Sequence, residues 1–152
     1  MKIMVSACLL GIDCKYDGGN NRTDWVRRLA EKHELIPVCP ETLGGLSAPR
    51  LPCEIVNGVV RNRNGESVDK AFRQGAEKGL RLARENHVDC LILQSRSPSC
   101  GVNEIYDGTF SGNKIEGMGI FASLMAENGF RVLDVSDAES LFTDERPAPD
   151  GE

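Results

Sequence analysis

Long apolar runs and an excess of positive charge are missing from this sequence, and we expect its first residues to form a buried strand and not a signal peptide. No stretch approaches the ~20 consecutive apolar residues that a transmembrane helix needs, and too few residues precede Val5-Ser-Ala-Cys8 for a secretory h-region. The 18 Lys and Arg residues are outnumbered by 23 Asp and Glu, and the net charge of -5 does not suit binding to a nucleic acid polymer. We therefore expect a cytoplasmic protein that acts on a small molecule and does not associate with a membrane. We expect it to be a monomer or a dimer.

The sequence also gives little support for a histidine-based catalytic triad or for a disulfide framework. The two histidines, His33 and His87, fall near the ends of expected helices. A surface position near the negative end of the helix dipole is the simpler explanation for both. The six cysteines form neither a C-x-x-C pair nor a C-x-x-C-x-x-C run. A disulfide framework is not expected, because the cytosol keeps thiols reduced and 152 residues can bury a core without staples. Each cysteine therefore needs its own explanation.

Expected strands and helices alternate along the chain. Short β-favouring runs predict strands over residues 2–7, 35–38, 88–93 and 130–135. Helical periodicity follows each strand, over 23–33, after residue 67, over 117–128 and after residue 136. This alternation predicts an α/β fold: a single doubly wound, mainly parallel sheet flanked by helices over residues 1–142. We expect residues 143–152 to form an acidic flexible tail.

Three local signals refine this pattern. Asn57-Gly58 supplies the two positive-φ residues of a type I′ turn and predicts a small β-hairpin excursion from the sheet. Gly75 and Gly79 lie on the apolar side of the second helix and predict a close approach to a sheet. Ser136 and Glu139 form the S-x-x-E pattern of a capping box, which predicts a helix start at Ser136.

Three cysteines stand where an expected strand ends. They are Cys8, Cys39 and Cys100. Because the carboxyl ends of parallel strands share one edge, where open α/β folds bind ligands, we expect these three thiols to converge. Thiolates hold soft metals and iron-sulfur clusters, so the pattern predicts a metal or cluster site with an incomplete set of protein ligands. The alternative for each thiol is an inert buried cysteine.

The remaining cysteines have weaker functional signals. Cys90 begins its expected strand, which places it ~15 Å from the carboxyl edge at ~3.3 Å per residue, and we interpret it as core packing. Cys14 lies in the same expected loop as Cys8, and three alternatives stay open for it: a fourth ligand, a reactive thiol, or no functional role. Cys53 precedes the hairpin without an evident role.

Polar residues near the three thiols are candidates for chemistry. Glu41 lies two residues after Cys39, where a carboxylate can activate water or donate a proton. Ser97-Pro-Ser99 precedes Cys100 and can direct hydroxyl groups at inorganic sulfide. Arg50 is a candidate for orienting a polar substrate. The alternatives are an exposed loop carboxylate, ordinary turn chemistry and a solvated arginine.

A glycine-rich segment later in the chain predicts a cover for a pocket. Residues 108–112, Gly-Thr-Phe-Ser-Gly, resemble a mobile loop, and Phe110 can stack on a flat ring. Tyr106-Asp-Gly108 repeats the earlier Tyr16-Asp-Gly18, and each copy follows a candidate ligand. We assign Tyr106 and Phe110 to the substrate-binding surface.

Five motifs stand out when they are taken together. They are Val5-Ser-Ala-Cys8-Leu-Leu-Gly11, Cys14-Lys-Tyr-Asp-Gly18, Cys39-Pro-Glu41 with Gly44-Gly-Leu46 and Pro49-Arg50, Ser97-Pro-Ser-Cys-Gly101, and Tyr106-Asp-Gly-Thr-Phe-Ser-Gly112. This set resembles the thiouracil desulfidase family over nearly the whole chain, up to about residue 142. The resemblance implies an α/β domain with a 4Fe-4S cluster held by three cysteines, which match Cys8, Cys39 and Cys100.

The resemblance also implies the activity. The fourth iron of the cluster would be free to bind the sulfur of a thiolated nucleobase such as thiouracil, which is converted to uracil with release of hydrogen sulfide and no redox change. A nearby carboxylate and a serine are implied at the substrate, and they match Glu41 and either Ser97 or Ser99. Cys14 matches a family motif but has no place in the three-ligand scheme.

Three other interpretations use the same residues. Zinc held by the same three thiolates, with water in the fourth position, would give a hydrolase. A persulfide on Cys14 or Cys100 would give a sulfur carrier that needs no metal. A cluster without turnover would give a binding or redox-sensing module.

Overall fold

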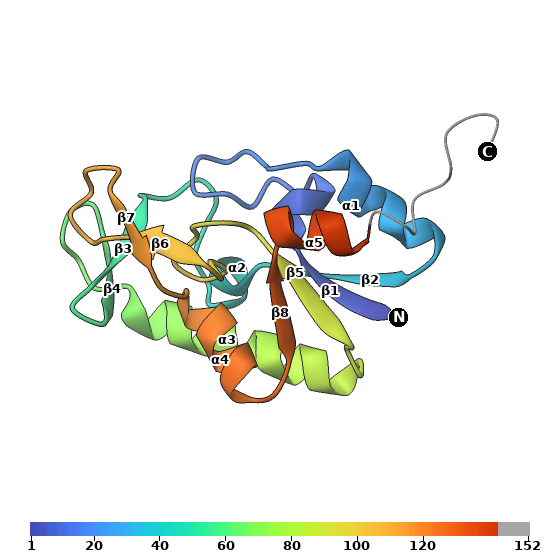
Figure 1. Cartoon of the computed structure of the whole chain (residues 1–152). Coiled ribbons are helices and arrows are strands. Elements are labelled where there is room, and N and C mark those ends of the chain that lie inside the picture. The colour runs from blue at the N-terminus through green and yellow to red at the C-terminus, as the bar shows by residue number, and fades with distance from the viewer. Residues whose placement is uncertain (143–152) are drawn as a thin grey trace.

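Four parallel strands form the central sheet of the protein in its computed structural model, of which residues 1–142 are described (Figure 1). The strands lie in the order β2-β1-β5-β8 and pair in parallel throughout. Their bounds are Lys2–Ser6 for β1, Glu34–Val38 for β2, Cys90–Leu93 for β5 and Arg131–Asp134 for β8. The predicted doubly wound parallel sheet is confirmed. The predicted tail over 143–152 lies outside the described residues.

Helices cover both faces of this sheet. Helix α1 (Asp24–Arg28), its 3-10 extension η2 (Leu29–Glu31) and α5 (Val135–Leu141) lie on one face, and α3 (Asp69–Glu85) and α4 (Ile120–Glu127) lie on the other (Figure 1). Every residue of β5 is buried, as expected for a strand covered on both sides. Alternate side chains of β1 enter two separate apolar clusters, one under each helical layer. Within residues 1–142, no helix is long and apolar enough to cross a membrane.

The connections that leave β1 and β5 create a crevice at the carboxyl edge of the sheet. Helix α1 follows β1 on one face of the sheet, whereas α4 is the helix that follows β5 and lies on the opposite face. The chain therefore leaves neighbouring strands β1 and β5 toward opposite sides, and doubly wound folds bind ligands at such a switch point. The loops that leave β1 and β5 carry Cys8 and Cys100.

Two small hairpins and two short helical turns surround this edge. The hairpin of β3 (Cys53–Val56) and β4 (Val59–Asn62) turns at Asn57 and Gly58, whose φ angles of 51° and 80° confirm the predicted type I′ turn. A second hairpin, β6 (Glu104–Tyr106) and β7 (Lys114–Glu116), is not evident from the sequence, because its strands have three residues each and little apolar alternation. The helical turns are η1 (Ala7–Leu10) and α2 (Pro40–Leu43).

The predicted contact of Gly75 and Gly79 with a sheet is wrong, because both glycines meet helices. A Cβ atom on Gly75 would lie 1.8 Å from the carbonyl oxygen of Pro40 in α2. A Cβ atom on Gly79 would lie 2.5 Å from a ring carbon of Phe121 in α4. The two glycines therefore allow α3 to approach α2 and α4 more closely than an alanine would permit.

The predicted capping box at Ser136 is also wrong. Helix α5 begins at Val135, and the side chain of Asp134 accepts a hydrogen bond from the Ser136 backbone N–H as its N-cap. Asp134 is 4% exposed and also accepts a hydrogen bond from the Ser95 hydroxyl at 2.8 Å. Aspartate and serine cap helices about equally well. The N-cap is Asp134 and not Ser136, because Asp134 also binds Ser95 in the loop after β5.

Candidate active site

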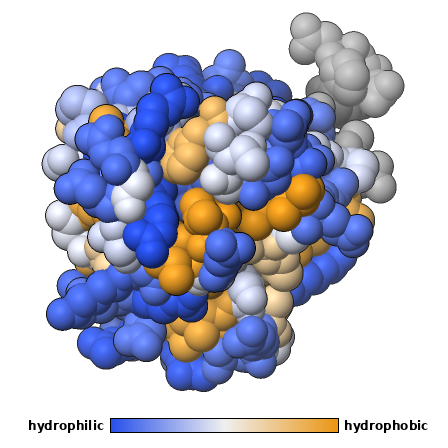
Figure 2. Space-filling view, turned by 90° about the vertical axis from the view of Figure 1, so that its left-hand side faces the viewer, coloured by the Kyte–Doolittle hydropathy of each residue, from blue (hydrophilic) through white to orange (hydrophobic). Residues whose placement is uncertain are grey.

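A cavity of about 440 Å³ opens at the carboxyl edge of the sheet. The loops after β1, β2 and β5 supply one side of its wall, and both hairpins supply the other. The face of the molecule at this end shows hydrophobic surface gathered near its middle with hydrophilic surface around it (Figure 2). This is the arrangement typical of a small-molecule site.

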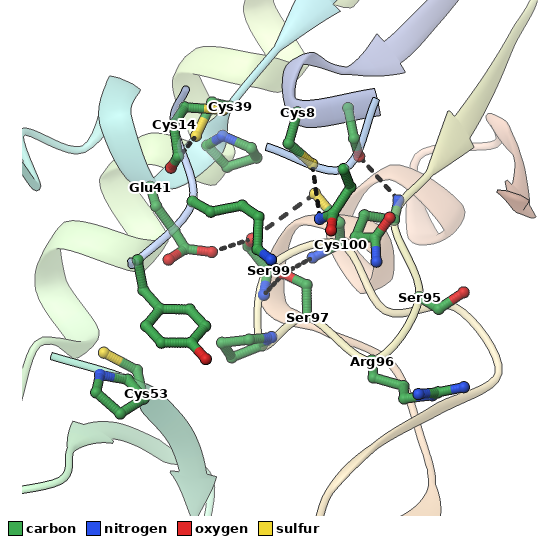
Figure 3. Close-up of a pocket in the computed structure, with 18 of the residues that line it drawn as sticks. Cys8, Cys14, Cys39, Glu41, Cys53, Ser95, Arg96, Ser97, Ser99 and Cys100 are labelled. Carbon is green, nitrogen blue, oxygen red and sulfur yellow. Dashed lines mark hydrogen bonds between the residues drawn. The ribbon is translucent and has the colours of Figure 1, made fainter. Parts of the chain in front are cut away.

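The three cysteines expected at the strand ends all line this cavity (Figure 3). Cys8 lies in η1, Cys39 is the residue before α2, and Cys100 lies in the loop after β5. Each sulfur has a polar side-chain group beside it: Asn21 Nδ2 at 3.5 Å from Cys8 Sγ, Thr42 Oγ1 at 3.1 Å from Cys39 Sγ, and Ser99 Oγ at 3.7 Å from Cys100 Sγ. Three thiols from distant stretches of chain therefore share one polar-lined space.

Cys14 lies beside Cys8 and Cys39 and influences the protonation of both. Its thiol is the main reason that the pKa of Cys39 is lowered to about 6 and that the pKa of Cys8 is also lowered. The pKa of Cys14 itself is raised, first by Cys39 and then by Cys8. The Cys14 thiol thus favours the thiolate form of both neighbours, and its own ionisation is disfavoured in return.

The other cysteines differ in position and environment. Burial raises the pKa of Cys100 to about 12 and that of Cys53 to about 11. Cys53 lines the same cavity but lies apart from the other four thiols in Figure 3. Cys90 begins β5 and is buried in the core. Among residues 1–142, no three His, Cys, Asp or Glu side chains stand close enough to hold a single metal ion.

Glu41 lies in the first turn of α2 and projects toward the same cavity. Pro40 opens this helix, where its fixed φ and missing N–H are tolerated. One carboxylate oxygen, Oε1, accepts hydrogen bonds from Arg50 Nε at 3.1 Å and Nη2 at 2.9 Å. The other oxygen, Oε2, accepts a hydrogen bond from the Ser99 hydroxyl at 2.8 Å. The side chains of Glu41 and Arg50 are only 13% and 9% exposed, so this ion pair is largely shielded from water.

The two candidate serines have different contacts. Ser97 Oγ accepts hydrogen bonds from the backbone N–H groups of Ser99 and Cys100, which shapes the loop after β5. The hydroxyl oxygens of Ser97 and Ser99 are 2.9 Å apart. Because Ser99 donates to Glu41, the Ser97 hydroxyl is left to donate to Ser99. Ser99 is therefore the serine in direct contact with the carboxylate.

Arg50 binds protein groups with most of its donors. In addition to Glu41, it donates to the carbonyl oxygens of Ser47 at 2.9 Å and Cys14 at 3.0 Å. Four of its five N–H groups are thereby directed at protein acceptors. The structure thus shows Arg50 joining Glu41 to the Cys14 loop, and its role in substrate binding stays a prediction.

Tyr106 and Phe110 are half-buried and line the cavity on the side of the hairpins. Their loop is held by Glu54, a residue that the sequence analysis did not select. Glu54 Oε1 accepts hydrogen bonds from the backbone N–H groups of Gly108 and Phe110. No motif in the sequence marks Glu54, because a carboxylate in a short hairpin strand is ordinary until its burial is known.

Comparison with known proteins places this arrangement in context. A sequence profile described as 2-thiouracil desulfurase matches residues 3–137. The chain is 38% identical over 150 residues to YbbK, an uncharacterised protein of Bacillus subtilis (strain 168), covering 92% of this chain and 99% of the relative. It is also similar to the solved structure of the 4Fe-4S-dependent thiouracil desulfidase TudS. That match has a TM-score of 0.88 and 34% identity, and it covers 95% of this chain and 97% of the other.

Proposed function

Because this chain belongs to the 2-thiouracil desulfurase family, we propose that it is an iron-sulfur-dependent desulfidase. Its reaction would convert a thiolated nucleobase such as thiouracil, with water, to uracil and hydrogen sulfide without redox change. The observation that carries this proposal is the position of Glu41, held between Arg50 and Ser99 in the cavity that three separate cysteines line.

Cys8, Cys39 and Cys100 would hold a 4Fe-4S cluster, and their surroundings fit that group. Sulfur ligands suit iron-sulfur clusters, and each of these thiols has a hydrogen-bonding group beside it of the kind that tunes cluster sulfurs. When bound by three cysteines, the cluster would supply an open iron as a Lewis acid for the thiocarbonyl sulfur. All six cysteines are free thiols, which fits our assignment of the protein to a reducing compartment such as the cytoplasm.

Glu41 would act as the general base. Its Oε2 atom would take a proton from the water that attacks the ring carbon bearing the sulfur. The carbon-oxygen bond forms as the carbon-sulfur bond breaks, and the sulfur leaves with the protons that water supplied. Arg50 occupies Oε1 and so leaves Oε2 as the reacting oxygen. Ser99 would exchange its hydrogen bond to Glu41 for one to the water or the ring.

The hairpin side of the cavity would bind the ring. Phe110 and Tyr106 offer aromatic surface for stacking on a flat heterocycle. The net charge of -5 favours a free base over a polynucleotide as the substrate.

Replacement of Glu41 by glutamine separates chemistry from cofactor binding. Protein purified without oxygen should be brown, and Glu41→Gln should keep the cluster absorption while losing sulfide release from 2- or 4-thiouracil by roughly 10²-fold or more. Glu77→Gln, an exposed carboxylate on α3, is the matched control and should match wild type. Full activity of Glu41→Gln would remove Glu41 from the mechanism.

The same preparation decides between this proposal and its alternatives. A colourless protein that carries zinc would favour the hydrolase, and it would contradict the cluster. Replacing Cys8 with serine should abolish cluster absorption and turnover. A persulfide carrier that uses Cys14 or Cys100 would instead be nearly unaffected by the Cys8 change. A cluster with no sulfide release from any thiolated base would indicate a binding or sensing module.

A further inference from the structure

Glu54 is a buried carboxylate that the proposed chemistry does not use. It lies in β3 and is 9% exposed. Within residues 1–142, no lysine, arginine or histidine forms an ion pair with it. Burial of a carboxylate is costly unless hydrogen bonds compensate the lost hydration. Its position therefore calls for a specific partner.

That partner is the backbone of the loop between β6 and β7. Glu54 Oε1 accepts hydrogen bonds from the N–H of Gly108 at 2.9 Å and from the N–H of Phe110 at 3.1 Å. Hydrogen bonds to an ionised carboxylate are stronger than those between neutral groups. Two of them converge on one oxygen and hold three consecutive residues of the loop against β3.

The loop adopts a backbone that requires such support. Phe110 has a φ angle of 56°, which is unfavourable for a bulky residue. Gly108 has a φ angle of 92°, and a Cβ atom there would lie 2.6 Å from the carbonyl oxygen of Ile55. The loop therefore lies directly on the β3 backbone, and a strained conformation at Phe110 persists where Glu54 holds the N–H groups of Gly108 and of Phe110 itself.

We propose that Glu54 is a positioning residue that holds the Phe110 loop as one wall of the substrate cavity. Glu54, Tyr106 and Phe110 all line that cavity. A wall carrying Phe110 at a set distance selects flat heteroaromatic rings, because stacking needs one planar face against another. The statement about the substrate rests on the proposed desulfidase function, whereas the hold on the loop does not.

Hydrogen exchange of individual amides tests the hold on the loop without any substrate. In the wild-type protein, the amides of Gly108 and Phe110 should exchange slowly. Glu54→Ala should speed their exchange by at least about tenfold while leaving the central strand β5 protected. Glu54→Gln should restore most of the protection, because its amide oxygen can accept the same two hydrogen bonds. Glu104→Ala, which removes a half-exposed carboxylate from β6, is the control and should leave both amides unchanged.

The kinetics of sulfide release test whether the Phe110 loop contributes to substrate binding. Glu54→Ala should raise KM for thiouracil by about tenfold, with a smaller change in kcat and unchanged cluster absorption. Phe110→Ala should raise KM similarly, and the double variant should add little to either.

Each result supports or overturns the proposal. Unchanged exchange of Gly108 and Phe110 in Glu54→Ala would overturn the hold on the loop. Faster exchange with an unchanged KM would overturn the role of the loop as a substrate wall. If the wild-type protein releases no sulfide from any thiolated base, the proposed function fails, but the exchange measurement still decides what Glu54 does.

Discussion

Gly75→Ala tests whether the contact between α2 and α3 determines the position of Glu41. The added Cβ atom would lie 1.8 Å from the carbonyl oxygen of Pro40 and 2.9 Å from the backbone nitrogen of Gly44. Both neighbours are backbone atoms and cannot rotate away. Because non-bonded heavy atoms normally rest about 3.5 Å apart, α2 must move away from α3 by roughly 1 to 2 Å.

The expected cost in stability is moderate, because two effects oppose each other. Overpacking of this kind typically costs about 1–3 kcal/mol. Alanine in place of glycine within a helix recovers up to about 1 kcal/mol. We therefore expect Gly75→Ala to lower the free energy of unfolding by up to about 2 kcal/mol, which leaves most molecules folded.

The expected cost in activity is larger. Glu41 follows Pro40 directly, so a shift of α2 changes its 2.8 Å contact with Ser99. A misplacement of about 1 Å in a catalytic group can cost about 10²-fold in rate. Cluster absorption is to be measured in the same samples, because Cys39 stands at the start of α2 and would move with it.

Gly79→Ala is the matched control for this prediction. It lies on the same face of α3, but its added Cβ atom would meet the side chain of Phe121 in α4 at 2.5 Å and not the backbone of α2, which carries Glu41. Denaturant unfolding should show a loss of stability in both variants. Sulfide release per cluster should fall only in Gly75→Ala. Equal activity of the two variants would refute the idea that this helix contact positions Glu41.

Three further predictions concern single hydrogen-bonding groups. Ser99→Ala should keep cluster absorption and lower turnover by roughly 10²-fold, measured as sulfide release, because Glu41 loses its contact at Oε2. Arg50→Lys should lower turnover although the positive charge remains, because an ammonium cannot replace the forked contacts with Glu41, Ser47 and Cys14. Asp134→Ala should reduce the free energy of unfolding by about 1 kcal/mol or more, measured with denaturant, because α5 loses its N-cap; an unchanged midpoint would contradict it.

The positions of the strands followed from local sequence. Runs of β-favouring residues separated by helical periodicity were enough to predict β1, β2, β5 and β8, and their parallel pairing is confirmed. The type I′ turn at Asn57-Gly58 was equally local, because its two residues alone favour positive φ angles. Elements without a strong local signal were missed, namely the short helix α2 and the hairpin of β6 and β7.

Contacts between distant segments were beyond such reasoning. The sequence placed Gly75 and Gly79 on the apolar side of α3, but it could not show that two helices rather than the sheet would meet them. It offered Ser136 as a helix cap, whereas Asp134 took that position because it also binds Ser95 across the chain.

For the active site, the sequence was enough to predict which cysteines lie at the same edge of the sheet. The hydrogen bonds between side chains in the site became known only from the tertiary structure. Cys8, Cys39 and Cys100 share a cavity because strand ends in a parallel sheet share an edge, a consequence that the alternating pattern already contains. The links of Glu41 to Arg50 and Ser99, and the burial of Glu54, depend on side chains packed from separate segments. Such contacts form only when distant segments pack together, because the distance between two loops depends on the packing of the whole domain and not on any short stretch of sequence.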